Sequence, residues 1–77
     1  MFVDFEKGAD KVRITDLDVK KVDVQMPYEL KTSIGQLKSV QIFEDTIQIT
    51  LFNQGTGTVT IWVYKTSTQN WTKLVLL

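Results

Sequence analysis

The feature that most constrains this fold is the alternation of apolar and polar residues over positions 46–65. Aliphatic residues occupy positions 47, 49 and 51, and after residues 53–57 they recur at positions 59, 61 and 63. A period of two is typical of half-buried β-strands. Residues 53–57 include two glycines, which supply the positive φ angles that hairpin loops need. The segment therefore predicts a β-hairpin.

The register of this hairpin follows from the requirement that its apolar residues share one face. A loop of residues 53–57 pairs Phe52 with Thr58 and places Ile49 opposite Ile61. All aliphatic residues of the two strands then lie on the same side, and a slip by one residue would separate them. We therefore expect the aliphatic side to face the core and the other side to carry Trp62 and Tyr64.

The turn before this hairpin passes the same test. If residues 44–45 form a tight connection, Phe43 pairs with Thr46, and Val40 and Ile42 join the aliphatic face. Glu-Asp lacks the glycine or asparagine that such a turn prefers. The pattern nevertheless favours a three-stranded meander over residues 37–65.

The rest of the chain gives shorter patterns. Strands are expected at residues 2–5, 12–15 and 19–26, with a change of parity at Lys20 and Lys21 that either a β-bulge or a loop between two strands explains. Pro27 closes this section, and residues 28–34 suit a single helical turn or an irregular crossover. Residues 71–77 are nearly continuously apolar, which is typical of a strand buried on both sides or at the seam of a curled sheet.

These elements predict one all-β domain over residues 1–77, with five to six antiparallel strands and at most one short helical turn. Its carboxy-terminal part is a meander. A small barrel and a two-layer sandwich both accommodate the pattern.

Composition excludes several functional classes. The chain has no cysteine and no histidine, so thiolate or imidazole metal sites and Ser-His or Cys-His catalysis are impossible. We therefore expect no metal, no cofactor and no enzymatic activity. Nine basic and nine acidic residues give a net charge of zero, which argues against nucleic-acid binding.

Hydropathy bears on localisation. No stretch approaches the roughly 20 apolar residues of a membrane helix, and Asp4 and Glu6 interrupt the apolar start of the chain. We expect a soluble protein without a signal peptide or a membrane partner, in the cytoplasm of the producing or host cell.

The candidate site is the face opposite the aliphatic one. By the register above it combines aromatic residues with uncharged polar ones, and the predicted partner-binding residues are Phe43, Gln48, Phe52, Thr60, Trp62 and Tyr64. Interfaces are enriched in aromatics and depleted of charge at their centres. The alternative is that the amino-terminal segment or residues 28–34 cover these aromatics and make them a second core layer.

These observations favour a non-enzymatic protein–protein interaction module, such as a small virus- or phage-type structural or accessory protein. It would form a homo-oligomer or inhibit a host enzyme by direct binding. The second hypothesis is a carbohydrate- or small-ligand-binding module with Trp62 and Tyr64 as stacking platforms and Gln48 and Thr60 as hydrogen-bonding neighbours.

Charged residues concentrate in the first half of the chain. The aspartates at positions 10, 16, 18 and 23 could supply oxygen ligands to calcium, but they match no calcium-binding loop. Interleaved Lys11, Arg13, Lys20 and Lys21 instead predict cross-strand ion pairs on a solvated face.

Overall fold

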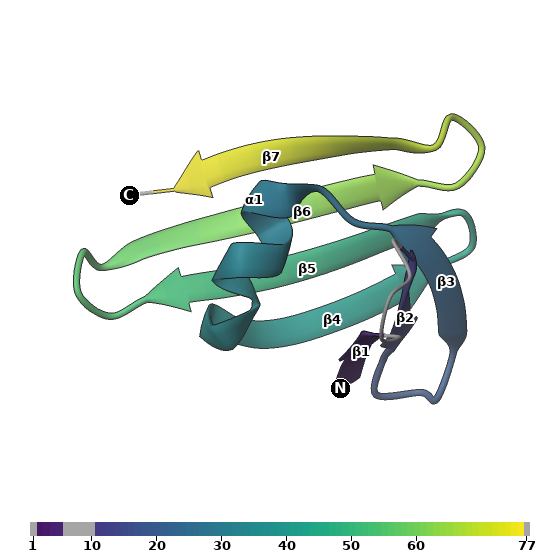
Figure 1. Ribbon diagram of the computed structural model, residues 1–77, viewed down its shortest axis with the longest axis horizontal. Coiled ribbons are helices and arrows are strands. Elements are labelled where there is room, and N and C mark those ends of the chain that lie inside the picture. Colours follow the sequence, from purple (N-terminus) through teal and green to yellow (C-terminus); the bar gives the residue numbers. More distant parts are fainter. Residues whose placement is uncertain (1, 6–10, 77) are drawn as a thin grey trace.

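The computed structural model describes residues 2–5 and 11–76, which form two antiparallel sheets and a short helical segment (Figure 1). The three-stranded sheet consists of β1 (Phe2–Phe5), β2 (Lys11–Thr15) and β3 (Lys21–Gln25). The four-stranded sheet is a meander of β4 (Leu37–Phe43), β5 (Thr46–Asn53), β6 (Thr58–Lys65) and β7 (Asn70–Leu76). Helix α1 (Tyr28–Ser33) and the 3-10 turn η1 (Ile34–Gln36) connect the two sheets.

The predicted all-β class, carboxy-terminal meander and short helical turn are confirmed. Of the two predicted closures, the structure agrees with the sandwich, since no strand pairing joins the two sheets in the described residues. The described residues contain seven strands instead of five to six, because both short amino-terminal segments form strands of their own.

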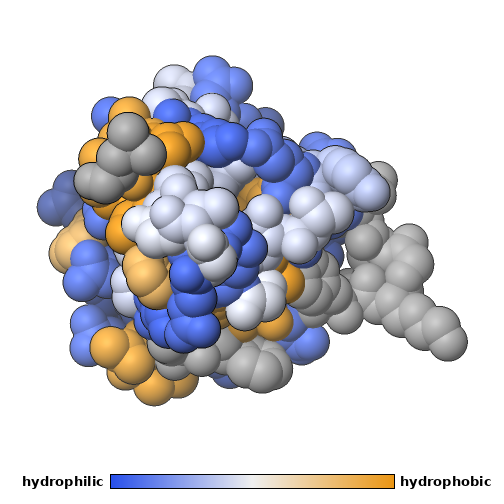
Figure 2. All heavy atoms as spheres, turned by 90° about the vertical axis from the view of Figure 1, so that its left-hand side faces the viewer, coloured by the Kyte–Doolittle hydropathy of each residue, from blue (hydrophilic) through white to orange (hydrophobic). Residues whose placement is uncertain are grey.

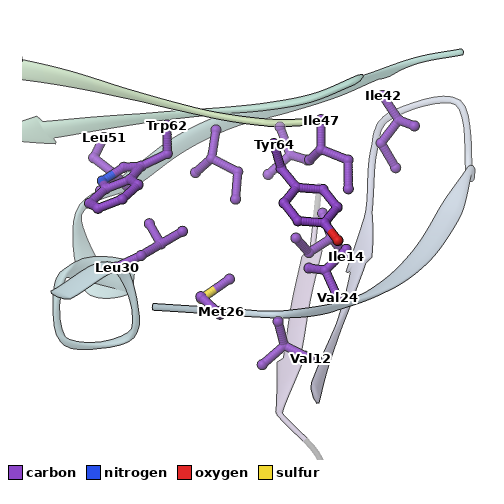
Figure 3. Close-up of a cluster of buried hydrophobic side chains, with 12 residues drawn as sticks. Val12, Ile14, Val24, Met26, Leu30, Ile42, Ile47, Leu51, Trp62 and Tyr64 are labelled. Atoms are coloured by element: carbon purple, nitrogen blue, oxygen red, sulfur yellow. The ribbon is translucent and has the colours of Figure 1, made fainter. Parts of the chain in front are cut away.

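The hydrophobic core lies between the two sheets. The four-stranded sheet contributes Val40, Ile42, Ile47, Ile49, Leu51, Trp62 and Tyr64. The opposite layer contributes Val12, Ile14, Val24, Met26 and Leu30. Figure 3 shows Trp62 and Leu51 pointing toward Leu30, and Tyr64 pointing toward Val24 and Ile14. Helix α1 and the small sheet therefore cover the same side of the large sheet.

Helix α1 is held on the sheet by one buried side chain and one ion pair. Pro27 precedes the helix with a φ of −60°, and Leu30 is fully buried against the sheet. Glu29 forms an ion pair with Lys73 of β7. These two contacts place the helix over the half of the sheet that includes β7.

The parity change near Lys20 is a loop and not a bulge. β2 ends at Thr15 and β3 begins at Lys21, so the predicted strand start at Val19 is wrong. Val19 has a φ of 63°, which ends any extended conformation there.

The predicted cross-strand pairing is confirmed for Arg13. Its Nε donates a hydrogen bond to Oδ1 of Asp23 at 3.0 Å, and this hydrogen bond lowers the pKa of the Asp23 carboxyl.

Candidate interaction surface

Two hairpin loops with the same geometry set the register of the large sheet. The N–H of Gly57 donates to the carbonyl of Asn53 at 2.8 Å, and the N–H of Gln69 donates to the carbonyl of Lys65 at 2.7 Å. Gly57 and Gln69 close their loops with φ angles of 70° and 56°. Each loop therefore spans four residues, 54–57 and 66–69.

The β5–β6 register consequently differs by one residue from the predicted one. Ile49 lies opposite Trp62 instead of Ile61, and Ile47 lies opposite Tyr64. A four-residue loop turns β6 over, which buries two large aromatic rings and brings its β-branched residues to the other side. The predicted β4–β5 register is confirmed, with Val40 opposite Ile49.

The predicted partner-binding residues are divided between the two faces of the sheet. Phe43, Gln48 and Phe52 lie on the face away from the core, whereas Thr60, Trp62 and Tyr64 lie on the core face. Trp62 is 6% and Tyr64 8% exposed, so neither forms the predicted surface. The aromatic rings belong to the core, as the alternative held, but to the same core as Ile49 and not to a second layer.

The side of β4–β7 away from α1 and β1–β3 is the outer face. Its apolar residues are Phe43, Phe52, Val59, Ile61, Val63, Leu74 and Leu76, and its polar ones include Ser39, Gln41, Gln48, Thr50 and Thr72. The pairing of Ile61 with Leu74 and of Val59 with Leu76 makes the apolar residues neighbours. Leu74 is 51% and Leu76 49% exposed.

No described element packs on the outer face, because α1 and β1–β3 all lie on the other side (Figure 1). Figure 2 views the molecule from the end with the β5–β6 loop, where apolar patches lie exposed among polar atoms. Among the described residues, the charged groups of this face lie at its ends: Lys65 ends β6, and the ammonium of Lys38 lies 5.7 Å from the centre of the Phe52 ring. The middle of the face is uncharged.

The β4 edge of the sheet is covered by the β2–β3 loop. Oδ2 of Asp16 accepts a hydrogen bond from the N–H of Ile42 at 3.2 Å. Nζ of Lys20 donates to the carbonyl of the same residue at 3.3 Å. Two side chains thus occupy both backbone groups of Ile42, and in the part of the chain that the structure describes the β7 edge has no counterpart.

Asp16 is the buried charge that holds this loop. Its Oδ1 accepts the N–H groups of Asp18 and Lys20, each at 3.0 Å. Burial acts to raise the pKa of Asp16, but the N–H groups of Lys20, Ile42 and Asp18, with the charge of Lys20, outweigh it and lower the pKa. Both carboxylate oxygens of Asp16 therefore accept hydrogen bonds from backbone N–H groups.

The other groups considered for ligand binding are not assembled. Among residues 2–5 and 11–76, no cluster of three or more histidine, cysteine, aspartate or glutamate side chains could hold a metal ion, and Asp10 lies outside the described residues. A cavity of about 340 Å³ is lined by Tyr64, Gln69 and Trp71 together with residues 25–27. The indole N–H of Trp71 is already donated to the carbonyl of Gln25 at 2.8 Å. Of the residues predicted to bind a sugar, only Tyr64 lines this cavity, so the cavity does not correspond to the predicted sugar-binding surface.

Comparison with known proteins gave no match to a family model, a curated protein or a solved structure. In the described part of the chain, neither helical segment has the length and apolar character needed to cross a bilayer. The decisive feature of the surface is an apolar sheet face that is uncharged in its middle and that no described element covers.

Proposed function

We propose that this chain is a non-enzymatic protein-binding module that associates with a second copy through its outer face. The supporting observation is that Ile61 and Val63 of the interior strand β6, together with Leu74 of β7, lie on a sheet face that no described element covers. Exposed contiguous apolar surface of this kind is typical of protein interaction sites. The uncharged centre fits the composition of such sites.

A second copy fits this face by its charge. A two-fold interface brings the same surface patch of both copies together, so any charge at its centre would meet a like charge. The outer face has its lysines at the ends, and the chain has a net charge of zero, which leaves association without a large repulsive term. Two such faces can stack about 10 Å apart with interdigitated side chains, as in a β-sandwich.

The size of the face also fits. Its strands contain seven or eight residues. Four strands about 4.8 Å apart, each about 25 Å long, cover on the order of 500 Å² per copy. Two copies would bury about 1,000 Å² in total, which is the lower limit for a specific interface. We therefore expect a reversible dimer whose population depends on concentration.

The test is the solution mass as a function of concentration for the wild type and for Ile61→Lys. Ile61 lies between Thr50 and Leu74 on the outer face, so a lysine there puts a charge at the centre of the interface. The variant should fold, since the long side chain can extend into solvent in the monomer. Gln41→Lys is the matched control, because Gln41 is exposed at the β4 margin of the same face.

The expected result is a wild type and a Gln41→Lys variant that dimerise with similar affinity, and an Ile61→Lys variant that stays monomeric with the wild-type circular dichroism spectrum. A wild type that is monomeric at the highest accessible concentration would contradict self-association. That result would favour the alternative in which the same face docks on a foreign protein, such as a host enzyme bound by a viral accessory protein.

A further inference from the structure

Strand β7 is an edge strand with the residue pattern of a central strand. Among the described strands, it pairs with β6 alone. Leu74, Val75 and Leu76 are 51%, 52% and 49% exposed, with Leu74 and Leu76 on the outer face and Val75 on the core face. A strand that is apolar on both faces is typical of the interior of a sheet, where it is covered on both sides and paired at both edges.

The two edges of the sheet are treated differently by the fold. Asp16 and Lys20 occupy the backbone groups of Ile42 at the β4 edge. β7 lacks the usual protections of an edge, since it contains no proline and its pairing with β6 runs from Asn70 to Leu76 without a bulge. A charged side chain at an edge also prevents strand addition, and only Lys73 is available in β7.

Lys73 is directed away from this role. Its ammonium forms an ion pair with Glu29 of α1 and lies 5.8 Å from the centre of the Trp62 ring. Both partners lie on the core side of the sheet, so the charge is held over the helix. The free backbone edge of β7 therefore has no charge directed along it within the described residues.

We propose that β7 pairs antiparallel with β7 of a second copy, so that the two four-stranded sheets join into one sheet of eight strands. The two copies would be related by a two-fold axis perpendicular to the sheet. This axis keeps both outer faces on the same side and both cores on the other. Pairing would satisfy the free backbone groups of β7 and cover its half-exposed apolar residues.

The position of the axis follows from side-chain pairing. Directly opposite residues must point to the same face, so the axis passes midway between the two copies of one residue, and this residue pairs with itself across the interface. An axis at Lys73 would place two ammonium groups opposite each other, which is destabilising. An axis at Leu74 pairs it with Leu74 of the second copy, places Lys73 opposite Val75 and Thr72 opposite Leu76, and uses five described residues. We infer this register.

A single-cysteine experiment tests the inference directly, because the chain contains no cysteine. In the proposed register the Cα atoms of the two residues at position 74 lie about 4.5–5.5 Å apart, within the range that a disulfide bridges. Sheets stacked face to face about 10 Å apart can also be bridged by a disulfide, as the inter-sheet disulfides of β-sandwiches show. Leu74→Cys is therefore measured both in the wild-type background and in an Ile61→Lys background, in which face-to-face packing is lost.

Under mild oxidation, Leu74→Cys should form a disulfide-linked dimer on the order of 100-fold faster than Thr68→Cys at about 10 µM protein, since a bound neighbour has an effective concentration near millimolar. Thr68 is exposed in the β6–β7 loop, and its cysteine measures random collision. A mixture of Thr72→Cys and Leu76→Cys should form the mixed disulfide faster than either variant links to itself. Circular dichroism of each reduced variant verifies the fold.

Equal oxidation rates for Leu74→Cys and Thr68→Cys would overturn the inference. Rapid linkage of Thr72→Cys to itself, with slow linkage at position 74, would overturn the register. Repeating the experiment in an Ile61→Lys background separates the two proposals, because Ile61 is on β6 and does not take part in the edge pairing. Linkage that persists there supports the edge pairing, whereas linkage that disappears assigns the disulfide to stacked outer faces and overturns the inference.

Discussion

Truncation of Trp62 is the strongest test of the β5–β6 register. Trp62 is 6% exposed and its ring packs edge-on against Trp71 with centroids 6.2 Å apart. In the register predicted from the aliphatic pattern it would instead lie on the outer face, and Ile61 would be in the core. Comparing Trp62→Ala with Ile61→Ala therefore separates the two registers.

The expected magnitudes differ clearly. Replacing a buried tryptophan by alanine costs about 3–5 kcal/mol, because the lost transfer free energy adds to the energy of the cavity. Ile61 lies half-buried on the outer face of the monomer, so its truncation should cost about 1 kcal/mol or less. At about 0.05–0.15 kcal/mol per residue, a chain of 77 residues has a total stability of roughly 4–12 kcal/mol. Trp62→Ala thus removes a large part of it.

The assay is urea unfolding followed by far-ultraviolet circular dichroism, at a concentration where the wild type is monomeric, so that association does not contribute to stability. Trp62→Ala should lower the midpoint strongly or unfold the chain at room temperature, whereas Ile61→Ala should shift it slightly. Ile49→Ala, at a fully buried position common to both registers, serves as the positive control. If Ile61→Ala were as costly as Ile49→Ala while Trp62→Ala were mild, the register described above would be wrong.

Two further predictions concern the loops. Gly57→Ala should destabilise the fold by about 1 kcal/mol because its φ is 70°, and Gln69→Gly should stabilise it by up to about 1 kcal/mol because Gln69 has a φ of 56°. If urea unfolding showed that Gly57→Ala stabilises the fold or that Gln69→Gly destabilises it, the shared loop geometry would be contradicted. Since the pKa of Asp16 is lower in the folded state, its charge stabilises the fold above the ordinary pKa of about 3.9, and this contribution is lost as the pH falls through the lower folded value. Asp16→Asn should therefore weaken the fold at neutral pH and reduce its loss of stability below about pH 4, and an unchanged acid dependence would show that another carboxyl dominates.

The β4–β5 register could be predicted from the sequence because its apolar pattern has one solution. Within each strand, isoleucine and valine occupy one parity only, at even positions in β4 and at odd positions in β5, and a tight turn at Glu44 connects the strands. Strand β6 has no such single solution, since its two parities carry Val59, Ile61 and Val63 on one side and two aromatic residues on the other. Loops of four and five residues are both common in hairpins, so the pattern alone does not decide between them.

The three site residues that were assigned to the wrong face follow from this difference of one residue in the length of the β5–β6 loop. The signal that would have corrected it is Gly57, which is the closing residue of a four-residue loop and the position that needs a positive φ. Of the six predicted site residues, Phe43, Gln48 and Phe52 lie on the outer face and the other three lie on the core face. Once β6 is turned over, Trp62 and Tyr64 leave the outer face and Ile61 and Val63 replace them.

The role of Asp16 could not be predicted because it depends on a distant part of the chain. The carboxylate accepts from the N–H of Ile42, which is 26 positions away, and neither residue has a local pattern that indicates the contact. A charged residue is rarely buried unless its partners are already in place. Local periodicity therefore gave no indication of this role, which arises from tertiary packing: Asp16 joins the β2–β3 loop to the β4 edge.

In strand β7 the sequence predicts more burial than the monomer provides. Its apolar pattern over residues 71–77 predicted a strand buried on both sides or at the seam of a curled sheet, and the monomer leaves Leu74, Val75 and Leu76 about half exposed. The pattern and the environment agree only if other surfaces complete the burial. Stacking on the outer face would cover Leu74 and Leu76 but not the free backbone edge, and edge pairing would satisfy that edge. The two proposed contacts are thus complementary, and β7 is the strand that both of them need.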